Sequence, residues 1–207
     1  METDQLAIPG RRTQQQRREA TRTRLMDATI ESLIECGYYA ATTLEIERRA
    51  GVSRGARIHH FPTKASLLAA AVDHLYDQVS GSYELAFGAA APGTSDAQRV
   101  HNGLRRLWET FRAREYSAVI ELTVAARTDD ELRACLQEVG LRHRALALEA
   151  AARHFALPAE LAFPLIESCH AAMMGLLLRR NVQGDDGVGD LVIGMLEQLI
   201  VSQLPRS

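Results

Sequence analysis

Cysteine is scarce in this sequence, and apolar runs of membrane-spanning length are missing. The 207 residues contain three cysteines, Cys36, Cys135 and Cys169. They are too few and too far apart for a disulfide-stapled secreted domain. We expect them to be small core residues of a reduced, cytoplasmic protein. The N-terminus lacks the apolar core of a signal peptide. We also find no uninterrupted run of about 18 apolar residues, so no membrane span is expected.

Motifs of common enzyme classes are also absent. The sequence has no G-x-S-x-G elbow, no P-loop, no H-E-x-x-H and no C-x-x-C pair. No metal-ligand spacing is found among His74, His101, His143, His154 and His170. We therefore expect no enzyme activity, metal or cofactor. The hydrophobic content of 46% is that of a folded chain with a real core, in one or two domains.

Two short helices joined by a tight turn are expected near the N-terminus. A T-x-x-E capping box at residues 42–45 predicts a helix that starts at Thr43. Gly51 ends this helix, because glycine tolerates the left-handed conformation of a sharp turn. Ser53 is a natural cap for the next helix. Pro62 stops that helix after about two turns. This is the layout of a helix-turn-helix, whose second helix enters the major groove of DNA.

The second helix carries several side chains that could read DNA. Its polar members are Arg54, Arg57, His59 and His60. Arginine can bond guanine at two points, and basic side chains bind phosphate. Ile58 and Phe61 are expected to anchor the helix in the core, and Leu44 and Ile46 give the helix before it apolar side chains. The alternative for the two arginines is an ordinary solvated face.

Residues 24–72 resemble the tetracycline-repressor-like (TetR) family of one-component bacterial regulators. The matching residues are Gly37-Tyr38, Thr42, Ile46, Ala50-Gly51-Val52-Ser53-Arg54-Gly55, and His60-Phe61-Pro62-Thr63-Lys64 with Leu67-Leu68. The resemblance implies an all-α homodimer with about nine helices in each chain. It also implies a palindromic operator, and repression that is relieved by a small-molecule effector. We therefore expect a ligand-responsive repressor with a helix-turn-helix DNA-binding domain at 16–63 and a ligand-binding and dimerisation domain at 64–207.

The resemblance also implies which residues contact the operator. These are Thr42 and Thr43, then Arg54, Gly55, Ala56, His59 and His60, and finally Lys64 as a phosphate ligand. Ser53 and Arg57 are further candidates on the same surface. Two positions depart from the family pattern: Glu47 replaces a small residue, and Arg57 replaces an apolar one. If these two side chains pair, Arg57 is structural and does not read a base.

Charge is distributed unevenly along the chain. The net charge is −2, but residues 1–70 hold 11 basic and 8 acidic residues, whereas the remainder holds 13 and 18. The N-terminal basic residues are Arg11, Arg12, Arg17, Arg18, Arg22 and Arg24. Beside a DNA-reading head, we expect Arg17 and Arg22 to contact phosphate or the minor groove. The alternative is a solvated chain, and residues 1–15 are expected to be a disordered arm.

The rest of the chain follows the helical period, and no strand pattern is found. We expect helices over 64–87, from 95 to 111, and from 116, followed by a helix capped by Thr128 and Glu131. A loop is expected at 88–94. Pro164 starts or kinks the eighth helix, and the last helix covers 191–204. The segments 164–181 and 189–204 are apolar on more than one face. We expect them to pair with a second copy of the chain, with an ordinary core helix as the alternative.

A ligand pocket is expected between residues 100 and 180, where an apolar lining carries a few polar groups. The candidate ligand contacts are Trp108, Phe111, Arg112, Tyr116, Glu121 and His143. Trp108 lies on a helical stripe, so plain core is its alternative. Glu121 has apolar neighbours, so we expect it to be buried against Arg112, Arg127 or a ligand. Two other readings stay open: a helical binding protein or enzyme with an incidental helix-turn-helix, and a repressor without a ligand.

Overall fold

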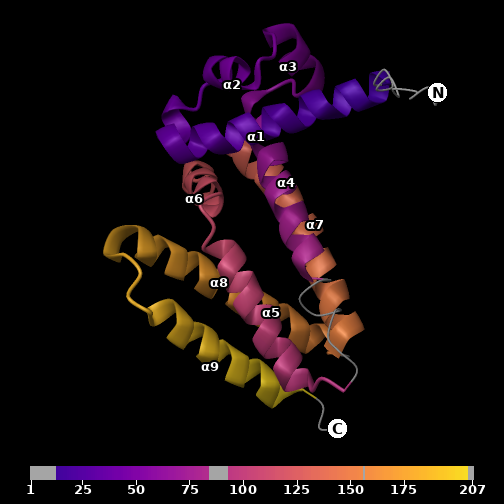
Figure 1. Ribbon diagram of the computed structural model, residues 1–207, viewed down its shortest axis with the longest axis vertical. Coiled ribbons are helices and arrows are strands. Elements are labelled where there is room, and N and C mark those ends of the chain that lie inside the picture. Colours follow the sequence, from indigo (N-terminus) through magenta and orange to yellow (C-terminus); the bar gives the residue numbers. More distant parts are fainter. Residues whose placement is uncertain (1–12, 84–92, 156, 205–207) are drawn as a thin grey trace, which may run out of the picture.

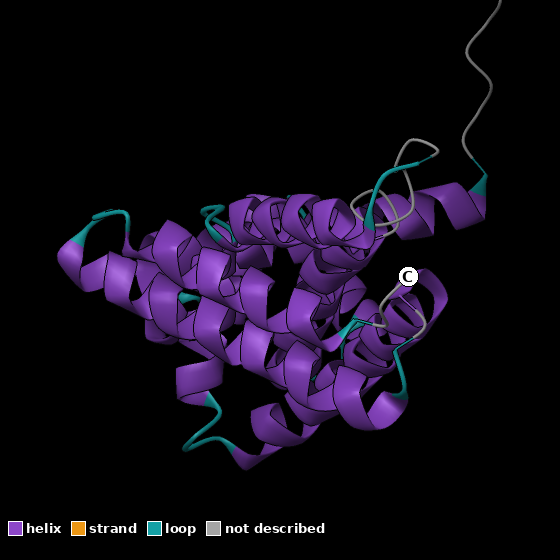
Figure 2. Cartoon of the chain, turned by 90° about the horizontal axis from the view of Figure 1, so that it is seen from below, coloured by secondary structure: helices purple, strands orange, loops and turns teal. Residues whose placement is uncertain are grey.

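The computed structural model describes residues 13–83, 93–155 and 157–204, and every regular element in these ranges is an α-helix (Figure 2). In chain order they are α1 (Gln14–Ala40), α2 (Thr43–Ala50), α3 (Arg54–His60), α4 (Lys64–Tyr83), α5 (Asp96–Phe111), α6 (Tyr116–Ala125), α7 (Asp130–Phe155), α8 (Ala159–Gln183) and α9 (Val188–Gln203). The predicted all-α class is confirmed. The predicted disordered arm and the predicted loop at 88–94 lie mostly outside the described ranges, but residues 14 and 15 already belong to α1.

The helices form a small head, α1–α3, on a longer body, α4–α9 (Figure 1). Helix α1 lies across the top of the body, with α2 and α3 above it. Helix α4 leads from the head into the body and packs along α7. Helix α6 lies beneath α1, while α5, α8 and α9 pack together at the far end of the body. The head therefore contacts the body mainly through α4 and α6.

The predicted caps explain where the helices of the head begin and end. Thr42 Oγ1 accepts from the Glu45 N–H at 3.2 Å, and Ser53 Oγ accepts from the Ala56 N–H at 3.3 Å. Gly51 ends α2 with φ at 61°, in the left-handed region. The second hydrogen bond of the predicted capping box, from the Thr42 N–H to the Glu45 carboxylate, is not formed. The Thr42 N–H donates to the Ala40 carbonyl, and the Glu45 carboxylate accepts from arginines further along α2.

Three helix starts in the body differ from the sequence-based expectation. Asp129 caps α7 by accepting from the Leu132 N–H at 2.9 Å, so Thr128 and Glu131 form no capping box. Helix α8 begins after Pro158 and contains Pro164 as an interior residue. Helix α9 begins at Val188, three residues before its predicted start. Aspartate and proline both favour helix starts, and local sequence does not distinguish between neighbouring candidates.

The outer faces of α8 and α9 are apolar and exposed. Their exposed large side chains are Leu161, Phe163, Leu178, Val182, Leu191, Met195 and Leu199. By length and composition alone, Glu160–Gln183 could cross a membrane, and 17% of its most apolar window is buried within the chain. The sequence-based expectation missed this helix because it considered only uninterrupted apolar runs. Composition alone does not distinguish a membrane span from a helix that is covered by another protein surface.

Candidate DNA-binding face and body cavity

The first turns of α2 and α3 reach the surface of the head. Most of the predicted DNA contacts lie there: Thr42, Ser53, Arg54, Gly55 and His59 are exposed, whereas Thr43, Ala56 and His60 are half-buried. The Ser53 cap fixes the first turn of α3, and this turn carries Arg54. Within the described part of the chain, Arg54 makes no ion pair. This surface therefore presents a cation together with several small polar groups.

Arg57 faces the interior, where it pairs with Glu47. Its Nε donates to Glu47 Oε1 at 3.0 Å, and both side chains are less than one tenth exposed. Its Nη1 also donates to the Phe61 and Pro62 carbonyls, at 3.2 and 3.3 Å. The buried guanidinium thus joins α2 to the end of α3, and its charge is compensated. The predicted Glu47–Arg57 pair is confirmed, and the burial of Arg57 does not support its prediction as a DNA contact.

Ile58, which was expected in the core, is exposed, and so is the apolar side chain of Leu44 in α2. Ile58 is 43% exposed and Leu44 is 75% exposed, whereas Phe61 is buried as predicted. Successive side chains on a helix differ in direction by about 100°. Because Arg57 occupies the interior position, the next residue, Ile58, turns outward. The departure at Arg57 was the one signal in the sequence that could have shown this.

The N-terminal half of α1 places positive charge beside α3. The guanidinium of Arg22 lies 4.8 Å from the centre of the Phe61 ring, and Arg17 is exposed. Burial lowers the pKa of His60, and the nearby charges of His59, Arg18 and Arg22 lower it further. The predicted basic surface at Arg17 and Arg22 therefore adjoins the end of α3.

Lys64 is held against α1 instead of projecting into solvent. Its Nζ donates to the Tyr38 carbonyl at 3.3 Å and lies 4.4 Å from the centre of the Tyr38 ring. Burial lowers the pKa of Lys64, although the carboxylate of Asp129 acts in the opposite direction. This geometry does not support the prediction of Lys64 as a phosphate ligand.

Tyr38 at the end of α1 contacts the body at several points, and we call Tyr38, Lys64, Glu121 and Asp129 the head–body joint. The Tyr38 phenol donates to Asp129 Oδ2 at 2.7 Å, and its backbone N–H donates to Glu121 Oε2 at 3.1 Å. Burial and the bond to Asp129 raise the pKa of Tyr38 to about 12. Gly37 is left-handed at φ 71°, and a Cβ there would lie 3.3 Å from Glu121 Oε2.

The joint corrects the prediction for Glu121. This residue is exposed, not buried, and its partner is the end of α1. Neither Arg112 nor Arg127 pairs with it in the described structure, and it does not line the body cavity. Glu121 therefore belongs to the contact between head and body and not to a ligand site.

A cavity of about 220 Å³ lies in the body, bounded mainly by α5, α7 and α8, with Tyr76 of α4, Tyr116 of α6 and Ile200 of α9 completing its wall. Its wall includes three of the predicted ligand contacts, Phe111, Tyr116 and His143. The Phe111 and Tyr116 rings stack with centres 4.3 Å apart, and the Tyr76 and His143 rings meet at 5.0 Å. Apolar side chains form most of the remaining wall. The cavity thus combines an apolar interior with a few aromatic and polar groups.

Trp108 and Arg112 lie outside this cavity. Trp108 is 5% exposed and packs on α9, where a Cβ at Gly189 would lie 2.4 Å from its Cζ2. Arg112 bonds Asp185 in the turn between α8 and α9. Both residues therefore fasten α5 to the last two helices, and this geometry does not support the prediction that they contact a ligand in the cavity. Phe111, one turn further along the same stripe of α5, faces the cavity, whereas α9 covers Trp108.

Comparison with known proteins agrees with this geometry. The family model described as "Bacterial regulatory proteins, tetR family" matches residues 25–71, from α1 into α4. An uncharacterized HTH-type transcriptional regulator of Mycobacterium tuberculosis (strain H37Rv) is 38% identical over 153 residues, which cover 74% of this chain and 75% of that one. The HTH-type transcriptional regulator CymR of Pseudomonas putida is 35% identical over 136 residues, or 66% of each chain.

Solved structures share the fold beyond the head. The crystal structure of the multidrug binding protein EbrR in complex with imidazole matches with a TM-score of 0.66 at 19% identity. The match covers 90% of this chain and 96% of that one. The relatives share most of the chain, and the helix-turn-helix lies where the family model matches. The chain therefore belongs to the TetR family of bacterial regulatory proteins and is a helix-turn-helix transcriptional regulator.

Proposed function

We propose that this protein represses transcription as a homodimer on a palindromic operator, and that a small molecule in the body cavity releases it. The observation that carries the proposal is the first turn of α3, where Ser53 caps a helix that presents the exposed Arg54. The first turns of a recognition helix are the part that reaches base edges in the major groove. Family membership supports the same role for the head.

Arg54 is the arginine of this helix pair that is available to a base. Arg48, Arg49 and Arg57 are each paired with a glutamate. Arg54 is exposed and forms no ion pair with the residues that the structure describes, so it can bond guanine at two points. The exposed Ile58 adds an apolar group that suits the methyl group of thymine. Arg17 and Arg22 on α1 would contact the neighbouring phosphates.

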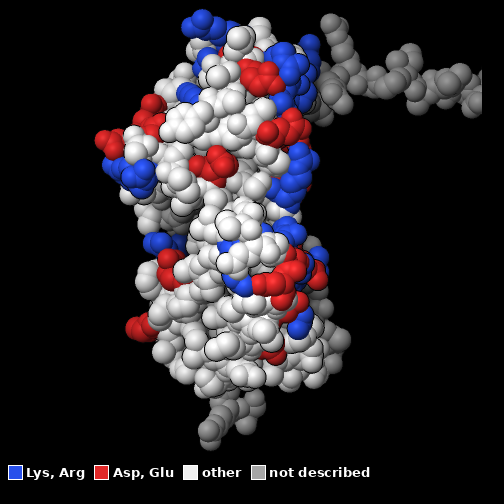
Figure 3. All heavy atoms as spheres, turned by 90° about the vertical axis from the view of Figure 1, so that its left-hand side faces the viewer, with Lys and Arg blue, Asp and Glu red and all other residues white. Residues whose placement is uncertain are grey.

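The exposed apolar face of α8 and α9 supports a twofold dimer. Val182, Leu191 and Met195 are 85%, 70% and 69% exposed. Figure 3 shows the side of the molecule on which these helices lie, and much of its lower half is free of charged side chains. Large apolar patches of this kind mark contact surfaces. Two copies of the head would then read two half-sites about one helical turn apart.

The cavity supports a small and mostly apolar effector. An apolar cavity of about 150 Å³ holds a benzene ring, and the cavity here is about 220 Å³. This size suits one ring with short substituents. Tyr76, Tyr116 and His143 would orient its polar group.

The head–body joint supports a route from the effector to the operator. Tyr116 is the first residue of α6, and Glu121 on the same helix holds the Tyr38 N–H. An effector that displaces Tyr116 would move α6 and, with it, the head. A coupling of about 1–3 kcal/mol would weaken operator binding roughly 5–150-fold.

The proposal is tested by measuring binding to DNA that flanks the coding region, using fluorescence anisotropy at several salt concentrations. We expect Arg54→Ala to cost about 1–3 kcal/mol on the specific site and to relax preference at one base pair. Arg106→Ala is the matched control, because Arg106 is an exposed arginine on α5, away from the head. If Arg54→Ala lost the same binding free energy on unrelated DNA, Arg54 would be shown to contact phosphate and not a base. If Arg54→Ala bound the specific site as tightly as wild type, the first turn of α3 would not be part of the DNA interface.

A further inference from the structure

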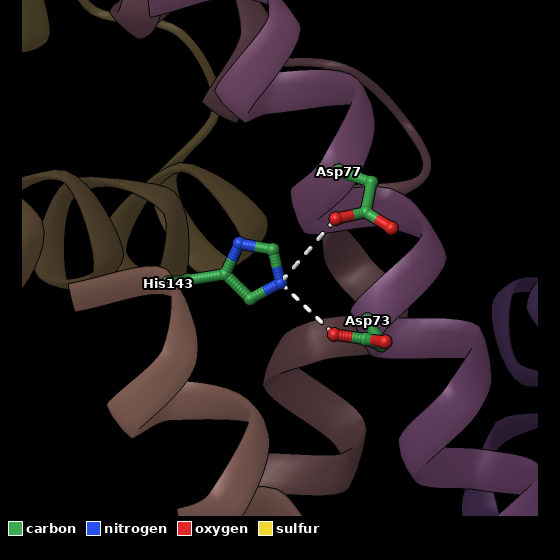
Figure 4. A group of neighbouring side chains, drawn as sticks. All are labelled: Asp73, Asp77 and His143. Atoms are coloured by element: carbon green, nitrogen blue, oxygen red, sulfur yellow. Dashed lines mark hydrogen bonds and ion pairs between the residues drawn. The ribbon is translucent and has the colours of Figure 1, made fainter. Parts of the chain in front are cut away.

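Three potential metal ligands converge between α4 and α7 (Figure 4). Asp73 and Asp77 are four residues apart on α4, so their carboxylates share one face of the helix. His143 of α7 points toward both (Figure 4). Its Nε2 lies 3.0 Å from Asp73 Oδ1 and 3.9 Å from Asp77 Oδ1. The three ligand atoms lie within 4.8 Å of one another, close enough to share one cation.

A single nitrogen of Arg142 already contacts all three ligand atoms. Its Nη2 bonds Asp73 Oδ1, lies 2.8 Å from Asp77 Oδ1, and lies 3.1 Å from His143 Nε2. A positively charged group therefore occupies the point at which the two carboxylates and the imidazole converge.

We propose that Asp73, Asp77 and His143 bind a divalent transition-metal ion of the Zn²⁺ or Co²⁺ type, which displaces Arg142. One imidazole with two carboxylates suits these ions better than Mg²⁺ or Ca²⁺, which prefer oxygen ligands alone. A divalent ion also neutralises both carboxylates, whereas one guanidinium neutralises only one.

Two of the three ligands are more buried than the group that must leave, while the third, Asp77, is 55% exposed. The His143 side chain is 10% exposed and that of Asp73 is 25% exposed, so packing restricts both. The Arg142 side chain is 49% exposed, so it can turn into solvent. The ion would enter from this open side.

A bound ion would clamp α4 to α7. Helix α4 carries the head, and Tyr76 on α4 packs against the His143 ring. Tyr76 and His143 both line the body cavity. The ion would therefore stabilise one arrangement of the helix that links head and body. The sequence analysis expected no metal because the histidine lies on a different helix from its partners, 70 positions from Asp73.

The test is titration of tag-free protein with Co²⁺, followed by visible ligand-field absorption, and with Zn²⁺, followed by calorimetry. We expect one ion per chain. Asp73→Asn should weaken binding more than about tenfold, the lower limit for losing even an outer partner of a metal site. Arg142→Ala should strengthen binding, because it removes the competing cation. His101→Gln is the control and should change nothing, since His101 contacts the single carboxylate of Glu197 at 2.9 Å.

Circular dichroism and thermal unfolding of each variant would establish that it is folded. Wild-type protein that binds no ion, or binding that is equal in Asp73→Asn, would overturn the proposal. Arg142→Ala that binds no more tightly than wild type would also overturn it, because the guanidinium would then not occupy the site. The measurement uses no DNA and no effector, so its failure would leave the proposed repressor function intact.

Discussion

The phenol of Tyr38 donates a 2.7 Å hydrogen bond to Asp129, which is also the residue that caps α7. The last turn of α1 is thereby joined to the start of a body helix. The same tyrosine receives Lys64 of α4 at its carbonyl and donates its backbone N–H to Glu121 of α6. A single residue of the head thus meets three separate parts of the body. Movement of any one of them must strain or break a contact at Tyr38.

Removing the Tyr38 hydroxyl should destabilise the protein in a pH-dependent way. We expect Tyr38→Phe to lower the free energy of unfolding by about 1 kcal/mol at neutral pH, the value of an ordinary hydrogen bond. The backbone N–H of Leu132 and the Tyr38 phenol lower the pKa of Asp129 from its ordinary 3.8. The stabilisation from this carboxylate is therefore complete above 3.8 and is lost as the pH falls through the lower value of the folded protein.

At alkaline pH, the stabilisation is lost as the pH rises instead of as it falls. The pKa of Tyr38 is raised from 10.0 to about 12, so its stabilisation is complete below 10 and is lost as the pH rises toward 12. The difference between wild type and Tyr38→Phe in urea unfolding should shrink at both extremes. Tyr39→Phe is the control, because Tyr39 is 90% exposed. If wild type and Tyr38→Phe still differed in free energy of unfolding at a pH where Asp129 is protonated, the Tyr38–Asp129 hydrogen bond would not be the cause of that difference.

The buried Glu47–Arg57 pair should be costly to break from one side. Arg57→Ala leaves the Glu47 carboxylate buried and unpaired, so we expect a loss of about 3–5 kcal/mol in urea unfolding. The double variant Glu47→Ala, Arg57→Leu should recover most of this loss, because both charges are gone. Arg48→Ala removes an arginine that is 68% exposed and should cost less than about 1 kcal/mol. If the double variant were less stable than Arg57→Ala, the charge of Glu47 would not be the source of the cost.

The proposed dimer predicts that a charge on the face of α8 and α9 yields monomers. Val182→Glu and Met195→Glu should sediment as folded monomers and lose specific operator affinity, because one head makes too few contacts. Leu176 is unsuitable for this test, since it is 9% exposed and belongs to the core of its own chain. Val124→Glu is the control, as Val124 is 59% exposed but lies on α6. If both variants remained dimers, the dimer interface would lie outside this face of α8 and α9.

Local chemistry made the helix starts of the head predictable. Thr42 and Ser53 cap their helices through amides three residues away, and Gly51 ends α2 through its own backbone conformation. Each of these signals lies within a few residues of its effect. The Glu47–Arg57 pair could also be predicted from the sequence. Both positions depart from the family pattern, and the two side chains that replace the usual residues carry opposite charges.

The body cavity was harder to predict, since a helical stripe shows that a residue is buried but not what covers it. Trp108 and Phe111 lie on one stripe of α5, yet α9 covers the first and the second faces the cavity. Glu121 was misplaced for the same reason. Its partner is Tyr38, 83 positions away, and its apolar neighbours on α6 carry no information about a helix of the head.

The contact between Gly189 and Trp108 gives a final test of how α9 is seated. A Cβ at Gly189 would lie 2.4 Å from Trp108 Cζ2, which no atom pair tolerates, so Gly189→Ala must displace either the ring or α9. We expect a loss of about 1–3 kcal/mol from overpacking and a red shift of Trp108 fluorescence as the ring meets water. Gly194→Ala is the matched control on the same helix, because nothing lies within 4 Å of its new Cβ. It should stabilise the protein by up to about 1 kcal/mol through helix propensity. Equal effects of the two substitutions would show that α9 does not pack on Trp108.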